Sequence, residues 1–134
     1  PYTTLFRSEA TSATTRDALH TVTFPAFDRV LVDAPCSNTG VIRRRVDLRW
    51  RLRPEEIERL RKSQLALLTD AAAAVKPGGL LVYSTCSLEP EENQDVVKQF
   101  LATHPEFQSV SERKLLPFAD GTDGAYAAAL RKMR

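Results

Sequence analysis

Two apolar runs, each followed closely by a cysteine, dominate the pattern of hydrophobic and polar positions along this chain. Residues 27–33 (FDRVLVD) precede Cys36, and residues 80–85 (LLVYST) precede Cys86. Near-continuous valine and leucine favour strands with apolar contacts on both faces, as in a parallel sheet. We therefore predict that both runs are β-strands.

The segment between the two runs has apolar positions at helical spacing. Pro54 is at a favoured first-turn position, and Glu55 and Glu56 complement the positive end of the helix dipole. The sequence KPGG at residues 76–79 is a strong signal for the end of a helix. Strand, crossover helix and strand make a βαβ unit, right-handed by default. The helical positions are Ile57, Leu60, Gln64, Leu68, Ala71 and Val75.

A second helix is predicted after Cys86, with Ser87 as its N-cap and an end near His104. Residues 107–110 are then predicted as a strand, whereas residues 125–130 fit either a helix, by alanine propensity, or a closing edge strand. The fold class is therefore α/β, with a mostly parallel sheet and crossover helices. The first turn of the second helix holds Pro90, Glu91 and Glu92, and its buried face holds Val96, Val97, Phe100 and Leu101.

Composition fits an ordinary globular protein. The 134 residues are 43% apolar and 27% charged, which corresponds to one domain or part of one. The longest apolar stretches are far too short for a membrane span, and the first thirty residues lack the basic start and apolar core of a signal peptide. We therefore expect a cytoplasmic protein with reduced cysteines.

Positive charge is concentrated in one window. Residues 43–62 contain nine basic and four acidic residues, a net +5 in a chain whose total is +2. Six arginines lie within residues 43–53, here called the arginine segment, directly after the first cysteine motif. The guanidinium fork suits phosphate binding, so we favour nucleic acid as the partner, with Arg43 and Arg44 as binding residues, over a merely solvated loop.

The first eight residues (PYTTLFRS) resemble a translation of the tail of a widely used DNA-sequencing adaptor, and no methionine begins the chain. We set residues 1–8 aside as an artefact and expect residues 9–134 to be part of a catalytic domain.

The two cysteines occupy similar places. In an open α/β sheet the ligand crevice lies outside the carboxyl ends of the parallel strands, so the two thiols are expected to meet there over one substrate. A disulfide and two small buried apolar side chains are the alternatives. The only histidines are His20 and His104, so a cysteine-protease dyad is poorly supported. The absence of a Cys-X-X-Cys or paired-histidine pattern argues against a metal site.

A thiolate can also add to carbon 6 of a pyrimidine, which makes carbon 5 electron-rich and able to attack an electrophilic methyl group. A base then removes the proton from carbon 5 and the thiolate leaves. The target base has to be unpaired or flipped out. Cys86 is expected to be ionised by the amino end of the helix predicted after Ser87, whereas Cys36 lies just upstream of the arginines.

Five motifs in this order resemble the RNA cytosine-carbon-5 methyltransferases, and within them the RsmB/Sun branch, bacterial enzymes that methylate 16S rRNA with S-adenosyl-L-methionine. The resemblance covers residues 17–131. The motifs are DAPCSNTGVIRR at 33–44, DLRW at 47–50, KPGG at 76–79, STCS at 84–87 and EPEEN at 89–93.

The resemblance implies a role for each of four residues. Cys86 would be the nucleophile on carbon 6, and Cys36 would assist release of the methylated RNA. Asp33 would lie near the methionine part of the cofactor and the target base, and Asp17 would reach the adenine. It also implies a monomeric full-length protein with 16S rRNA as partner. The alternatives are a tRNA or another rRNA cytosine as substrate, or a non-catalytic RNA-binding protein that keeps the fold.

Two departures from the family pattern matter. The family's glycine-rich cofactor loop should precede Asp17, but all five glycines lie at or after Gly40. We therefore expect the carboxyl-terminal half of a Rossmann-like methyltransferase domain, inactive by itself, with an unpaired edge on the strand that ends at Asp33. In the segment DGAYA at residues 123–127, Ala125 replaces an aromatic residue of the family.

Overall fold

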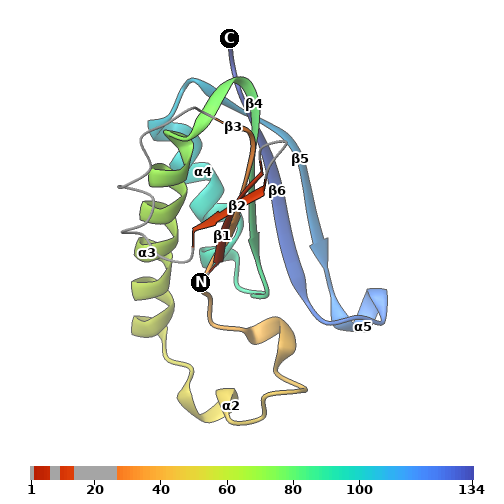
Figure 1. Cartoon of the computed structure of the whole chain (residues 1–134). Helices are drawn as coiled ribbons and strands as arrows, with labels where there is room; N and C mark the ends of the chain where they lie inside the picture. The colour runs from red at the N-terminus through yellow and green to blue at the C-terminus, as the bar shows by residue number, and fades with distance from the viewer. Residues whose placement is uncertain (1, 7–9, 14–26) are drawn as a thin grey trace.

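The computed structural model describes residues 2–6, 10–13 and 27–134, which form one sheet with helices packed on it. The strand order is β2-β1-β3-β4-β6-β5, shown in Figure 1. Neighbouring strands β3 and β4 are parallel, and the other neighbouring pairs are antiparallel. The α/β fold class is confirmed, but the prediction of a mostly parallel sheet was wrong: the sheet is mixed, because β1 and β6 flank the parallel pair β3–β4 in antiparallel orientation. The strands are β1 (Tyr2–Phe6), β2 (Ala10–Ala13), β3 (Phe27–Asp33), β4 (Val75–Thr85), β5 (Phe107–Leu115) and β6 (Ala125–Lys132).

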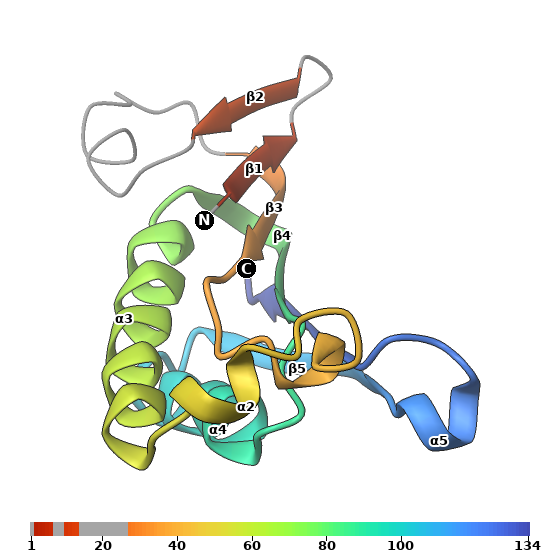
Figure 2. The same cartoon turned by 90° about the horizontal axis from the view of Figure 1, so that it is seen from below.

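Two longer helices, α3 and α4, contact each other and lie on the same side of the sheet (Figure 1). The short elements η1, α2 and η2 follow the carboxyl ends of β3 and β4, whereas α5 follows β5 and lies apart from α2 in Figure 2, the view from below. None of the helices in the described part of the chain has both the length and the apolar character needed to cross a membrane. The helical elements are η1 (Thr39–Val41), α2 (Leu48–Arg51), α3 (Pro54–Ala72), η2 (Pro90–Glu92), α4 (Gln94–Thr103) and α5 (Pro117–Asp120).

The core lies between the sheet and these two helices. Alternate strand residues such as Val30, Leu81 and Leu130 point into it and meet Leu68 of α3 and Phe100 of α4, and all five are at most 1% exposed. This alternation also settles the ambiguous segment at residues 125–130. It is a strand, because its even-numbered residues are buried against the core while its odd-numbered alanines are only half-buried.

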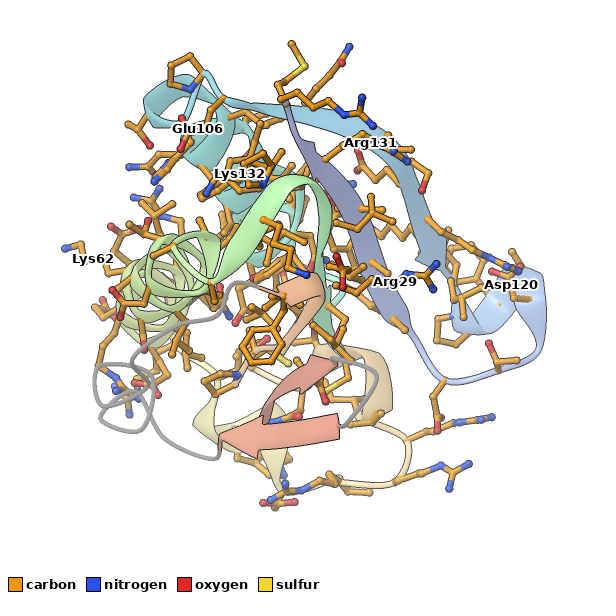
Figure 3. The ribbon with its side chains drawn as sticks, turned by 45° about the horizontal axis from the view of Figure 1, so that its top comes forward. Arg29, Lys62, Glu106, Asp120, Arg131 and Lys132 are labelled. Atoms are coloured by element: carbon orange, nitrogen blue, oxygen red, sulfur yellow. The ribbon has the colours of Figure 1, made fainter. Side chains whose placement is uncertain are left out.

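The predicted boundary between α3 and β4 was wrong by several residues. The helix ends at Ala72, and Val75 pairs with Phe27 as the first residue of β4. The KPGG sequence therefore lies inside β4, where the register with β3 shifts and Gly78 has a φ of 79°. Lys132, labelled in Figure 3, stabilises the connection between α3 and β4, because its Nζ donates to the carbonyls of Ala72 and Val75 at 3.2 and 3.0 Å.

The predicted start of the second helix was also wrong. The α-helix begins at Gln94 rather than after Ser87, because η2 and Asn93 intervene. Cys86 therefore lies eight residues before α4 in sequence, and Ser87 is not the N-cap of that helix.

The edge of β3 is not unpaired, contrary to expectation. Strand β1 pairs with it antiparallel, with Tyr2 opposite Asp33 and Phe6 opposite Arg29. Residues 2–6, which were set aside as an artefact, are thus part of the sheet.

Candidate active site

The two cysteines meet at one edge of the sheet because β3 and β4 are parallel neighbours. Asp33 pairs with Ser84, so β3 and β4 end at the same level of the sheet. The Sγ atoms of Cys36 and Cys86 are 3.2 Å apart, and both are free thiols. Cys36 is buried and Cys86 is half-buried, so Cys86 is the sulfur that faces solvent.

This contact makes the two thiols chemically different. The hydrogen bond with Cys36 lowers the pKa of Cys86, while the same bond, together with burial, raises the pKa of Cys36 far above its usual value. Of the two thiols, Cys86 is therefore the one that ionises first, and its thiolate would accept a hydrogen bond from the Cys36 thiol. The largest cause of the lowered pKa of Cys86 is thus a hydrogen bond with the partner cysteine, which the sequence did not indicate.

Asn38 completes the immediate surroundings of the sulfurs. Its Oδ1 accepts a hydrogen bond from the Cys86 Sγ–H at 2.8 Å, and its Nδ2 donates to the Cys36 carbonyl at 3.0 Å. Asn38 has a φ of 60°, the left-handed conformation that asparagine tolerates better than most residues. This turn brings its amide back over the cysteine pair.

Each cysteine faces its own cavity. Cys86 lines a cavity of about 330 Å³ together with Asp33, whose Oδ1 accepts a hydrogen bond from Ser84 Oγ at 3.1 Å. Cys36 and Asn38 line a second cavity of about 350 Å³. The first cavity is also lined by Thr85, Arg113, Leu115, Ala125, Tyr126 and Ala127, and the second by Ser37, Leu48, Leu52, Arg53, Glu56 and Leu60.

The buried carboxylate of Glu92 joins the two cysteine loops, the segments that follow β3 and β4 and carry Cys36 and Cys86. Its side chain is 0% exposed and accepts from Ser37 N–H and Gln64 Nε2, both at 2.9 Å, from Ser87 Oγ at 2.5 Å, and from Ser37 Oγ. Ser37 follows Cys36 and Ser87 follows Cys86, so this Glu92 network (Ser37, Gln64, Ser87 and Glu92) fixes both cysteines relative to each other. Sequence reasoning placed Glu92 in a helix turn and missed this role; an acidic residue amid small polar motifs was the available signal.

A second layer of hydrogen bonds supports the loop after Cys86. Asn93 receives a bond from Thr85 Oγ1 at 2.6 Å and donates to the Ser87 carbonyl at 2.9 Å. Tyr83 donates from its hydroxyl to the Glu92 carbonyl at 2.6 Å. The loop is therefore held through side chains and backbone together, with no regular helix at this point.

Two glycines let three chain segments touch at this edge. Gly40 N–H donates to the Cys86 carbonyl at 2.9 Å, and Gly124 N–H donates to the Gly40 carbonyl at 2.8 Å. A Cβ at Gly40 would lie 2.4 Å from the Gly124 oxygen and 2.6 Å from that of Cys86. No other residue fits there without moving the backbone.

The remaining predicted site residues lie outside this centre. Arg43 and Arg44 are exposed, and their Nε atoms share the carboxylate of Asp123 at 2.7 and 2.8 Å. Asp17 lies outside the described residues. Within residues 2–6, 10–13 and 27–134 there is no group of three His, Cys, Asp or Glu side chains that could hold a metal ion.

The fold and the site define a methyltransferase domain. A solved methyltransferase homologue from Pyrococcus horikoshii, 31% identical, superposes with a TM-score of 0.68 over 81% of this chain and 40% of its own.

The family model of the 16S rRNA methyltransferases RsmB/F matches residues 5–131, and the chain belongs to this family. A probable ribosomal RNA small subunit methyltransferase B of Bacillus subtilis is 38% identical over 96% of this chain and 32% of its own length. Ribosomal RNA small subunit methyltransferase B of Vibrio vulnificus is 47% identical over 79% of this chain and 26% of its own. The chain thus spans about a third or less of the length of these relatives.

Proposed function

We propose that the protein methylates carbon 5 of a cytosine in 16S rRNA, through a covalent bond between the base and Cys86. The observation that carries this proposal is the cysteine pair, in which a half-buried sulfur with a lowered pKa faces a cavity and a buried sulfur stands 3.2 Å behind it. Membership of a family described as 16S rRNA methyltransferases supports the substrate.

In this mechanism the Cys86 thiolate adds to carbon 6 of an unpaired cytosine held in the Asp33 cavity. S-adenosyl-L-methionine supplies the methyl group that carbon 5 takes up. The proton on carbon 5 must then leave before the bond between Cys86 and carbon 6 can break and release the product.

Cys36 is suited to assist that release. The largest cause of its raised pKa is the hydrogen bond to the Cys86 sulfur. Once Cys86 is bonded to the base, this sulfur is no longer an anion, and the pKa of Cys36 falls towards its ordinary value. Cys36 can then lose its own proton to solvent and, as a thiolate, take the proton from carbon 5 at the step that needs a base.

Asp33 is the described residue that fits the cofactor. Its carboxylate lies at the end of β3 on the wall of the Cys86 cavity, where it can accept hydrogen bonds from the methionine amino group or from the base.

We propose Asp17 as the contact to the adenine and Arg43 and Arg44 as contacts to RNA phosphate. Asp33 alone does not make a cofactor site, so we expect the 134-residue chain to bind the cofactor weakly and not to turn over. Micromolar binding in calorimetry would contradict this.

The test of the mechanism uses the full reading frame that encodes this chain, with 16S rRNA as substrate. Cys86→Ala should abolish methyl transfer. Cys36→Ala should slow the addition step without abolishing it, but block release, and so accumulate a covalent protein–RNA adduct, visible as a band of reduced mobility in denaturing gels. An adduct in Cys86→Ala and none in Cys36→Ala would overturn the assignment of the two roles.

A further inference from the structure

Trp50 is the most exposed large aromatic side chain in the described part of the protein. It is 85% exposed, although tryptophan normally buries most of its surface. It is also the only tryptophan in the chain. An indole left in water at a fixed place is unfavourable for stability and therefore needs another explanation.

The geometry of α2 explains why the indole points outward. Leu48 and Leu52 line the cavity beside Cys36, and the Leu52 N–H donates to the Leu48 carbonyl at 3.1 Å, which closes the single helical turn. Trp50 lies between them in sequence and therefore projects from the opposite face of the turn. The backbone N–H of Trp50 donates to the Asp47 carbonyl at 3.3 Å. The indole is thus displayed from a turn whose leucines line the cavity beside Cys36; Figures 1 and 2 show the place of this turn, α2, in the fold.

The charge around Trp50 selects the kind of partner. The arginine segment carries six arginines and one acidic residue, Asp47. Arg45 and Arg53 are exposed, and among the described side chains of the segment only Arg43 and Arg44 form ion pairs. An exposed ring among unneutralised guanidinium groups matches a strand of unpaired nucleotides, whose bases stack on aromatic rings and whose phosphates attract cations.

We propose that Trp50 is a stacking platform for an unpaired base of the RNA next to the target nucleotide, with Arg45 and Arg53 holding the adjacent phosphates. The target cytosine itself would lie in the other cavity, against Cys86. This inference rests on the proposed function, because it takes RNA as the substrate.

The first test follows Trp50 fluorescence in the 134-residue chain while short single-stranded oligocytidine RNA is added. Because Trp50 is the only tryptophan, every change in indole emission reports on it. Stacking should quench the emission in a saturable way. Inorganic polyphosphate, which offers the charge without the bases, should bind without comparable quenching. Equal quenching by polyphosphate, or none by RNA, would overturn the proposal.

The second test measures the affinity for the same labelled RNA by fluorescence anisotropy. Trp50→Ala should weaken binding by about tenfold, the usual loss for one stacked base, whereas Trp50→Phe should retain most of the affinity. Phe118→Ala is the matched control, because Phe118 is 84% exposed on α5, outside the arginine segment. Equal affinities for Trp50→Ala and Phe118→Ala would overturn the proposal.

A third measurement separates this inference from the proposed function. In the full reading frame, Trp50→Ala should raise KM for RNA and leave kcat nearly unchanged, while methyl transfer still depends on Cys86. If methyl transfer does not depend on Cys86, the proposed function fails, whatever Trp50 does. If polyglutamate quenches Trp50 and RNA does not, the surface binds an acidic protein and the inference fails alone.

Discussion

The Glu92 network and the arginine segment lie at the same end of the molecule, and they hold their polar groups in opposite ways. Glu92 is fully buried and accepts four hydrogen bonds from Ser37, Gln64 and Ser87. The described side chains of the arginine segment are largely exposed, and its ion pairs are the two that share Asp123. The Glu92 network is closed to water, whereas the charges of the arginine segment are solvated by it.

The two regions therefore have different roles: the Glu92 network positions the cysteine loops, and the arginine segment attracts a polyanion. Hydrogen bonds to a buried carboxylate cannot be replaced by water, so they fix the two cysteine loops in a single arrangement. Exposed charges are screened by salt and hold no geometry, yet they act on a polyanion at a distance. We therefore expect substitutions in the Glu92 network to change stability and thiol chemistry, and substitutions in the arginine segment to change RNA affinity.

The largest effect is expected for Glu92→Ala. It leaves the Ser37 N–H, the Gln64 amide and two hydroxyl groups buried without their acceptor. Breaking a buried charged network costs about 3–5 kcal/mol of the free energy of unfolding. Urea denaturation followed by circular dichroism measures this loss. Glu91→Ala, at the neighbouring exposed carboxylate, should change the free energy by less than about 0.5 kcal/mol. Similar losses in both variants would show that the network is not what holds the loops.

A smaller but clear loss is expected for Gly40→Ala. The added methyl would meet the backbone oxygens of Gly124 and Cys86, both closer than 3 Å. Overpacking of this kind costs about 1–3 kcal/mol. At Gly121 no atom lies within 4 Å of an added Cβ, and the φ of 67° is the only obstacle, so Gly121→Ala should cost about 1 kcal/mol. Thermal unfolding of the two variants separates crowding from backbone strain.

The sequence predicted the elements that carry the cysteines, because strand periodicity and the βαβ connection are local signals. Phe27–Asp33 has the predicted bounds, and the parallel pairing with β4 brings Cys36 and Cys86 together. The contact of 3.2 Å that differentiates the thiols was not predictable, since it depends on how two loops fold.

The errors arose where tertiary contacts override local signals. Ser87 has the sequence of an N-cap, but the buried Glu92 carboxylate takes its hydroxyl instead. KPGG ends helices by propensity, but pairing of Val75 with Phe27 draws these residues into β4. Local signals also did not indicate that Arg43 and Arg44, predicted as RNA-binding residues, both pair with Asp123, far along the chain.

The rates at which the two cysteines are alkylated measure how the contact between them changes their reactivity. In the wild type, iodoacetamide should modify Cys86 faster than Cys36, because Cys86 has the lowered pKa and is half-buried rather than buried. Cys36→Ala removes the hydrogen bond that stabilises the Cys86 thiolate, so the pKa of Cys86 should rise and the alkylation profile should move to higher pH. At any pH well below the pKa, a thiol whose pKa is higher by about one has a thiolate fraction about tenfold smaller. An unchanged profile, measured by mass spectrometry of the Cys86 peptide, would contradict this coupling.

The smallest effect on stability, and the sharpest contrast with Glu92, is expected for Asp123→Asn. Its two ion pairs with Arg43 and Arg44 are exposed, so their loss should change the free energy of unfolding by less than about 1 kcal/mol. The same substitution frees two guanidinium groups of the arginine segment and removes one negative charge, so the affinity for oligocytidine RNA should rise by about threefold at low salt. Because the gain is electrostatic, it should disappear at high ionic strength. Asp28→Asn is the matched control: it makes the same change in charge at the amino end of β3, where Asp28 pairs with Lys76 at 3.0 Å. An equal gain in both variants would mean that net charge alone attracts the RNA, and a loss of affinity in Asp123→Asn would mean that the carboxylate holds the arginines in the conformation that binds it.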